Sequence, residues 1–286
     1  MKIIKLAVYI VLAGIMFFAC DSPRKAPEKI EFINNFTAAK EIASKNKQPM
    51  VVEFYTKNCP WSKMLDDSTY TNSIVIKMSL DMVFVKINVE KDSLLAKNFG
   101  VSFYPTIILF LSNGAEVDRL VGYYPPCDFF NEIQLYLQGS ETLEDYLVRL
   151  ADEPDKIEYH LIVAEKYRNR SDWDLAIEYY SHVVRLSPED NFNVENATLE
   201  IAGIYAEKKE YSKAIESYND FISRFPDSDK IEDAIRRIPY CYKKKGDDKK
   251  AMELFEKYLY DYPNGKYAEW VANRIEELQK VLKEGI

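Results

Sequence analysis

Up to about residue 140, the chain alternates short apolar runs with amphipathic stretches. Two segments, PMVVEFYT (residues 49–56) and MVFVKINV (residues 82–89), are apolar along most of their length, which is typical of strands buried on both faces of a sheet. A third run, TIILFLS, is followed by SNG and AEVDRLVG, which predicts a hairpin with a glycine-containing turn. Helices are expected at residues 36–47, 59–67, 73–80, 94–99 and 129–137. This order of elements predicts an α/β domain with a mixed sheet over residues 30–139.

A different pattern fills residues 156–286, where small and aromatic residues recur at helical spacing in three sets. The spacing inside each set is the same, and the sets start at Ala164, Ala202 and Pro239, which are 38 and 37 residues apart. Small residues let two helices approach closely, an aromatic ring fills the space beside them, and proline ends the second helix. We therefore expect three helical repeats that stack into an all-α solenoid. The sets are Ala164, Tyr167, Ala176, Tyr180, Pro188; Ala202, Tyr205, Ala214, Tyr218, Pro226; and Pro239, Tyr242, Ala251, Phe255, Pro263.

A helix is also expected on either side of the repeats. Residues 140–155 are predicted to form a linking helix, and residues 266–283 a capping helix with Trp270 and Leu278 on its apolar side. Pro239 stands inside the first helix of its repeat, where we expect a kink or a shifted helix start.

Residues 1–19 have the composition of an export signal, with two lysines before an uncharged apolar run. The run is shorter than the roughly 20 apolar residues that a membrane-spanning helix needs. Its end, FFAC, resembles a bacterial lipoprotein signal, which implies that Cys20 carries a lipid and anchors the chain to a membrane. Residues 20–29 would then form a polar tether. The alternatives are ordinary signal cleavage and an uncleaved N-terminal anchor.

Charge and composition limit the kinds of partner and cofactor that this chain could bind. The net charge of -8 and the lack of a long basic run argue against a nucleic-acid partner. With 2 His and 4 Cys the chain cannot assemble a His-rich metal site, and we expect no cofactor. The space outside the inner membrane is oxidising. A lipid on Cys20 would leave Cys59, Cys127 and Cys241, so at least one thiol is free or pairs with another molecule.

The segments EFYTKNCPWSKM and FYPTIILFLSNGAEVDRLVGY resemble the active-site strand and loop and the cis-proline hairpin of thioredoxin-like proteins. The resemblance implies that Cys59 is the attacking cysteine and that Pro105 is the cis-proline facing it. It also implies that Glu53 is the buried carboxylate that assists proton transfer. Ser62 stands where such proteins usually have a second, resolving cysteine.

The residue types around Cys59 support a reactive thiol without the resemblance. A cysteine at the start of a helix meets unpaired backbone N–H groups and the positive end of the helix dipole, which favour the thiolate. Pro60 suits the first helical turn, because its missing N–H costs nothing there. With Ser62 in place of a second cysteine, Cys59 can attack a disulfide but cannot resolve the mixed disulfide within the motif.

Three interpretations are compatible with a single motif cysteine. Cys59 could work through a monothiol cycle resolved by an external thiol, or it could be resolved by the distant Cys127. Alternatively, Cys59 could be a residual cysteine in a non-catalytic assembly factor. Cys127 also fits a structural residue at the start of the last helix of the domain, and Cys241 a packed core thiol. Glu53 either relays protons or pairs with a nearby lysine.

The three helical sets resemble the tetratricopeptide repeat. The resemblance implies a concave groove that holds a protein or peptide partner. Taken with the lipoprotein-type signal that ends at Cys20, the sequence predicts a lipid-anchored protein of the bacterial cell envelope. It would face the periplasm, in the inner or the outer membrane. The positions that map to the groove are Arg168, Asn169, Arg236, Tyr240, Lys243 and Lys244.

Overall fold

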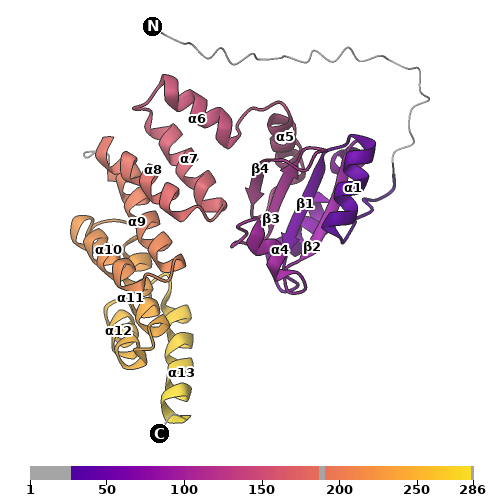
Figure 1. Cartoon of the computed structure of the whole chain (residues 1–286). Helices are drawn as coiled ribbons and strands as arrows, with labels where there is room; N and C mark the ends of the chain where they lie inside the picture. Colours follow the sequence, from indigo (N-terminus) through magenta and orange to yellow (C-terminus); the bar gives the residue numbers. More distant parts are fainter. Residues whose placement is uncertain (1–26, 187–190, 285–286) are drawn as a thin grey trace.

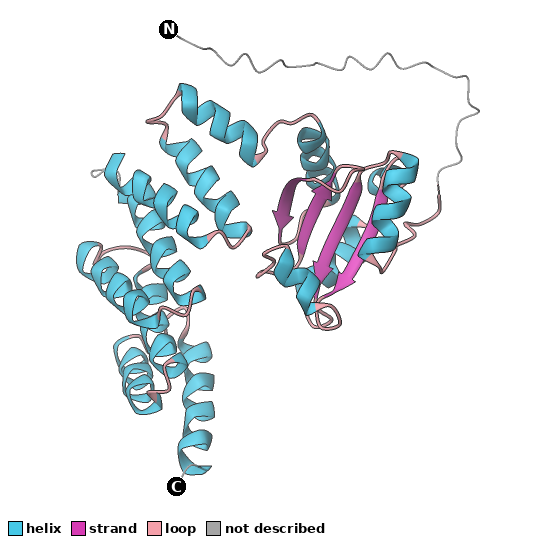
Figure 2. Ribbon diagram, in the orientation of Figure 1, coloured by secondary structure: helices cyan, strands magenta, loops and turns pink. Residues whose placement is uncertain are grey.

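The computed structural model of the chain describes residues 27–186 and 191–284, so the expected signal and Cys20 lie outside the described residues. An α/β domain comes first, and a row of helices follows it (Figure 1). The predicted fold class is confirmed, since a mixed sheet flanked by helices precedes an all-α array (Figure 2). Within the described ranges, no helix combines the length and the apolar character that crossing a membrane requires.

The described residues form one sheet with the strand order β2-β1-β3-β4. The central strand β1 (Met50–Tyr55) pairs in parallel with β2 (Val83–Asn88) and antiparallel with β3 (Thr106–Phe110). The edge strand β4 (Glu116–Val121) forms the predicted hairpin with β3. Because β1 lies between two strands and under helices on both faces, its apolar run is buried along nearly its whole length.

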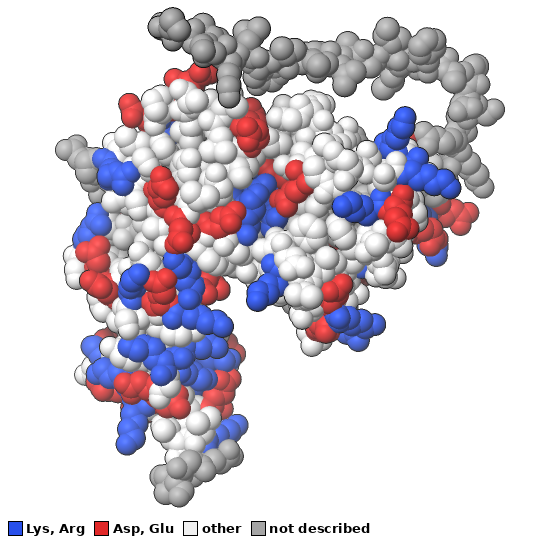
Figure 3. Space-filling model, in the orientation of Figure 1, with Lys and Arg blue, Asp and Glu red and all other residues white. Residues whose placement is uncertain are grey.

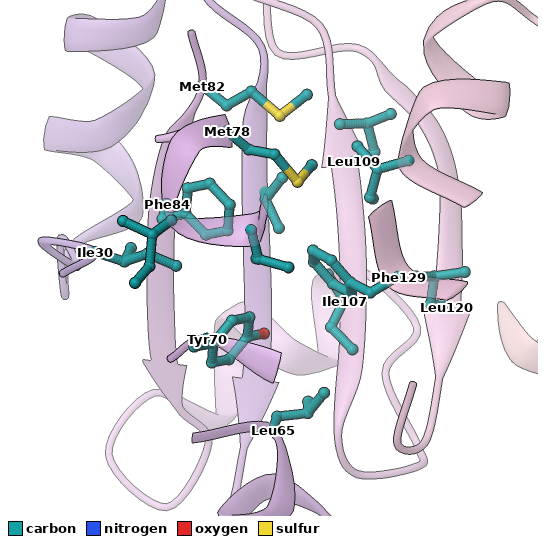
Figure 4. Packing of buried hydrophobic residues seen from close by; sticks show 14 of the residues in the cluster. Ile30, Leu65, Tyr70, Met78, Met82, Phe84, Ile107, Leu109, Leu120 and Phe129 are labelled. Carbon is teal, nitrogen blue, oxygen red and sulfur yellow. The ribbon is translucent and has the colours of Figure 1, made fainter. Parts of the chain in front are cut away.

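Side chains of β1 alternate between two hydrophobic cores, one on each face of the sheet. Val51 belongs to the core that α3 (Ser73–Met78) and α5 (Pro126–Leu137) cover, which Figure 4 shows from close by. Val52 belongs to the opposite core, which α1 (Phe36–Asn46) covers. This alternation explains why a strand with no polar face is stable here.

Three helices follow the strands and the hairpin. The short α2 (Pro60–Met64) begins after β1 and continues into a π-helical turn, Leu65–Thr69. After β2 comes α4 (Ser93–Asn98), which ends just before Gly100, as predicted. After the hairpin, α5 begins at Pro126, earlier than the expected residue 129.

The helical array consists of three consecutive pairs between a linking and a capping helix. Each helix packs mainly on the next one along the chain, which is the solenoid arrangement expected from the repeats. The linking helix is α6 (Leu143–Asp152), and the capping helix α13 (Ala268–Glu284) buries Val271 and Leu278. The pairs are α7 (Ile157–Asn169) with α8 (Trp173–Leu186), α9 (Asn191–Glu207) with α10 (Tyr211–Arg224), and α11 (Ile231–Lys244) with α12 (Asp248–Asp261).

Pro239 does not shift the start of its helix, contrary to one of our two expectations. α11 begins at Ile231 and passes through the proline to Lys244. Pro239 is buried at the place of the small residue of the other repeats, so packing on the neighbouring helices outweighs the lost backbone hydrogen bond.

A buried cluster of charges joins the α/β domain to the array. The Asp118 carboxylate on β4 is fully buried and accepts hydrogen bonds from Lys166 Nζ at 2.8 Å and Arg170 Nη2 at 2.6 Å. It also accepts one from the backbone N–H of Leu143 at 2.8 Å. Burial alone would raise the pKa of Asp118, but Arg170 and Lys166 hold that pKa below its usual value. Figure 3 shows acidic and basic side chains meeting where the two parts touch.

Candidate active site

Cys59 is the residue from which α2 starts. It ends the loop after β1, and Pro60 occupies the first helical turn behind it. The thiol is half-buried, and its Sγ donates a hydrogen bond to the carbonyl oxygen of Tyr104 at 3.3 Å. Residues that are 45 positions apart in the sequence therefore meet at the sulfur.

The loop that faces Cys59 leads into β3. The peptide bond between Tyr104 and Pro105 is cis. Thr106 Oγ1 donates a hydrogen bond to the carbonyl oxygen of Phe103 at 2.8 Å, which closes the loop on itself. Cys59 and the proline loop thus form one surface at the end of the sheet.

Ser62 lies one helical turn after Cys59, on the inner side of α2. Its side chain is buried, and its Oγ has no hydrogen-bond partner among the described residues. A buried hydroxyl without a partner contributes no stability to offset its burial. The position that a resolving cysteine would occupy therefore carries a group that cannot form a disulfide.

Glu53 is buried in β1 beside Lys86 of β2. Lys86 Nζ lies 3.3 Å from Glu53 Oε2, but without hydrogen-bond geometry, and it also pairs with Asp66. Burial of the carboxyl raises the pKa of Glu53 to about 7, against the opposing effect of Lys86. Lys86 is further held by the ring of Tyr55, whose centre lies 4.8 Å from Nζ. Glu53 therefore combines a pKa raised toward neutrality with a lysine partner, and both expected roles, a proton relay and a lysine pair, remain compatible with its position.

Comparison with known proteins assigns the family. Residues 31–134 match the family model described as Thioredoxin. Thioredoxin from Mycobacterium bovis is 31% identical to this chain over 102 residues, which cover 82% of that protein and 36% of this chain. The chain belongs to the thioredoxin family.

Other matches concern parts of longer proteins or the helical array. The thioredoxin domain is 26% identical over 108 residues to the thiol:disulfide interchange protein DsbD of Campylobacter jejuni, and it spans 36% of this chain but only 19% of that protein. Residues 195–273 match a family described as outer membrane lipoprotein. The TPR2AB domain of yeast Sti1 in a complex is 25% identical, with a TM-score of 0.38, over 45% of this chain and 48% of that one.

The two other described cysteines differ in their surroundings. Cys127 is exposed in the first turn of α5, at the rim of the thioredoxin domain, and forms no disulfide. Cys241 is fully buried in the helical array, and burial raises its pKa to about 11 although Arg237 opposes the shift. Cys241 is therefore a packed core thiol, as expected, whereas Cys127 is accessible.

The residues mapped to the repeat groove fall into two groups. Arg168 and Asn169 lie at the end of α7 beside the thioredoxin domain, and the Asn169 carbonyl oxygen accepts a hydrogen bond from Arg119 at 3.2 Å. The others lie on α11, where Lys243 pairs with Glu277 of α13 at 3.2 Å. That second group is Arg236, Tyr240, Lys243 and Lys244.

Sequence reasoning missed two features of the thioredoxin domain. The first is the identity of the lysine beside Glu53, although Glu53 and Lys86 hold the same position in the two apolar strands and are partners in the register of β1 and β2. The second is exposed apolar area on α2, the helix that begins at Cys59, where 54% of Trp61 and 40% of Met64 are accessible. Amphipathic spacing does not reveal such a surface, because α2 is only 5 residues long.

Proposed function

We propose that this chain carries out thiol–disulfide exchange through Cys59 as a monothiol protein. The observation that carries the proposal is that the half-buried Cys59 thiol, which contacts the Tyr104 carbonyl, has no second thiol near it on α2. A buried serine, Ser62, stands where a resolving thiol would be. The similarity of the thioredoxin domain to thioredoxins and to part of a disulfide interchange protein supports it.

The chemistry needs one external thiol for each cycle. The Cys59 thiolate attacks one sulfur of a client disulfide, a new S–S bond forms, and the other client sulfur leaves as a thiolate. An external thiolate then attacks the mixed disulfide and releases Cys59. No bond to Ser62 forms at any step, so the mixed disulfide lasts until the external thiol arrives.

Two further parts of the proposal concern location and partners. The match of residues 195–273 to an outer membrane lipoprotein family supports a place in the cell envelope, with a lipid on Cys20. The repeats of residues 156–286, after the linking helix of residues 140–155, offer the groove in which a protein partner docks. Such a protein would bring its partner and the thiol site together at one membrane.

Trapping of mixed disulfides tests the proposal. Cells or extracts are quenched with acid and a thiol-blocking reagent, and complexes of the wild-type protein are compared with those of variants. Cys59→Ser should abolish the complexes, and Ser62→Cys should shorten their lifetime by supplying an internal resolving thiol. Cys127→Ser is the matched control, because it removes an exposed thiol of the same domain.

The same variants separate this function from a role in assembly alone. If purified wild-type protein fails to react with a small aromatic disulfide, the thiol is inert and the monothiol proposal is wrong. If instead Cys127→Ser lengthens the life of the complexes, then Cys127 and not an external thiol resolves them.

A further inference from the structure

The first helical pair of the array reaches the loop that faces Cys59. The turn between α7 and α8 packs on the loop between α4 and β3, as the arrangement of the two parts in Figure 1 illustrates. Ser171 Oγ in this turn donates a hydrogen bond to the carbonyl oxygen of Gly100 at 2.8 Å and lies 2.7 Å from Ser102 Oγ. The array is therefore in contact with the loop that carries Tyr104 and Pro105.

Aromatic and cationic side chains meet at this contact. The ring of Trp173, at the start of α8, meets the ring of Phe103 edge-to-face with centres 6.2 Å apart. The guanidinium of Arg168 lies 4.7 Å from the centre of the same Phe103 ring. Phe103 directly precedes Tyr104, whose carbonyl oxygen accepts a hydrogen bond from the Cys59 thiol. These three side chains, Phe103, Arg168 and Trp173, form what we call the junction wall.

The junction wall is held in a fixed position relative to Cys59. Behind it, the buried Asp118 binds Lys166 and Arg170, and Arg119 donates to the carbonyl oxygens of Phe99 at 2.9 Å and Asn169 at 3.2 Å. Breaking such a buried cluster on one side is strongly destabilising, because it leaves buried charges with fewer partners. These contacts tie the helix that carries Arg168 to the domain that carries the thiol.

We infer that the junction wall selects clients of Cys59, and that Arg168 and Trp173 are specificity-determining residues. This inference rests on the proposed thiol exchange. The client it fits is an extended polypeptide with bulky apolar or aromatic side chains next to its cysteine, as exposed by an unfolded chain. Arg168, Trp173 and Phe103 are all half-buried, so each still presents part of its surface to such a chain.

The chemistry of the surface points to this occupant. The rings of Phe103 and Trp173 give an apolar surface on which aromatic side chains pack, and the exposed Trp61 and Met64 add apolar area on α2, the helix that begins at Cys59. The planar guanidinium of Arg168 adds a stacking face. An extended chain that pairs with the loop backbone beside Tyr104 runs past Phe103 onto the wall. We expect a small disulfide to touch Cys59 without reaching the wall.

A pair of matched peptides tests the inference. Each peptide carries one cysteine blocked as a mixed disulfide with thionitrobenzoate, flanked either by phenylalanine or by serine on both sides. The Cys59 thiolate attacks the peptide sulfur, the S–S bond to the peptide forms, and the coloured thiolate leaves, so both peptides share one leaving group. The free small aromatic disulfide provides the reference rate.

Wild-type protein should react about tenfold faster with the phenylalanine peptide than with the serine peptide. Trp173→Ala and Arg168→Ala should each lower this ratio to about threefold or less and leave the rate with the small disulfide unchanged. Trp173→Phe should restore the ratio. Tyr260→Ala, which removes an exposed aromatic residue of α12, is the control and should change neither rate.

Two results would overturn the inference, and they differ in meaning. If Trp173→Ala leaves the peptide ratio at its wild-type value while the small disulfide still reacts, the wall plays no part and the thiol exchange stands. If the wild-type protein does not react with the small disulfide at all, the proposed function fails and the inference fails with it.

Discussion

Replacing Gly100 by alanine tests how tightly the array is built onto the thioredoxin domain. Gly100 has a φ of +59°, and a Cβ at this position would overlap the carbonyl oxygen of Arg170 and lie 3.1 Å from its carbonyl carbon. Both clashing atoms belong to backbone, which cannot rotate away as a side chain can. The turn between α7 and α8 would therefore have to move off the domain.

Gly139→Ala is a closely matched control. Both glycines end a helix with the same pair of hydrogen bonds: Gly100 to Lys97 and Val101 to Ala96 in one case, and Gly139 to Tyr136 and Ser140 to Leu135 in the other. Gly139 also has a positive φ, +75°, but a Cβ there would meet no atom within 4 Å. Only the clash with the array distinguishes the two variants.

The magnitudes follow from this difference. Forcing alanine into the left-handed region costs about 1 kcal/mol in both variants. Gly100→Ala should lose about 3 kcal/mol more, because displacing the turn also separates Asp118 from its buried cations. Urea unfolding followed by tryptophan fluorescence measures both values, since Trp173 reports on the junction. Equal losses for the two variants would refute the view that the array is locked onto the domain.

Three further predictions concern charge and anchoring. Asp118→Asn should lower the free energy of unfolding by about 3 kcal/mol, because it removes the buried carboxylate that Lys166 and Arg170 share and leaves Arg170 only its longer contact with Glu116 at 3.5 Å, and urea titration measures the loss. Glu53 has a pKa raised from 4.5 to about 7, so its contribution to stability is fully present below pH 4.5 and is lost as pH rises through 7. Glu53→Gln should therefore match the wild type at about pH 4 and exceed its unfolding free energy by about 3 kcal/mol at about pH 8, and a constant difference across this range would contradict the burial argument. Cys20→Ala should release the protein from membranes into the soluble fraction on fractionation, and unchanged membrane association would exclude lipidation as the anchor.

Elements whose residues carry their own periodicity could be predicted from the sequence. The run around Val51 and Val52 predicted a strand buried on both faces, and the three small–aromatic sets predicted the helical pairs, because each signal lies within a few turns of one element. The prediction that Cys59 lies close to Pro105 came from the family resemblance. Spacing alone does not predict a contact between residues 46 positions apart (105 − 59).

The junction could not be predicted, because its parts are spread over distant elements. Asp118 lies in a hairpin strand with three charged residues, EVDRLV, which predicts contact with solvent, and its partners Lys166 and Arg170 come 48 and 52 residues later. Judged from its own strand or helix alone, each of these three residues would be predicted to lie on the surface. Only the docking of α7 on β4 buries them together.

The fixed junction and the absent resolving thiol have a linked consequence for the proposed cycle. Without an internal cysteine, the lifetime of the mixed disulfide depends on how soon an external thiol reaches Cys59. A thiol protein docked on the repeats would attack with an effective concentration set by geometry, not by a flexible linker. Because Asp118 and the Gly100 contact hold α7 in place, that concentration is high only for a partner whose thiol lies at the matching distance from its docking site. The same array that admits a client at the junction wall would thus also select which thiol releases it.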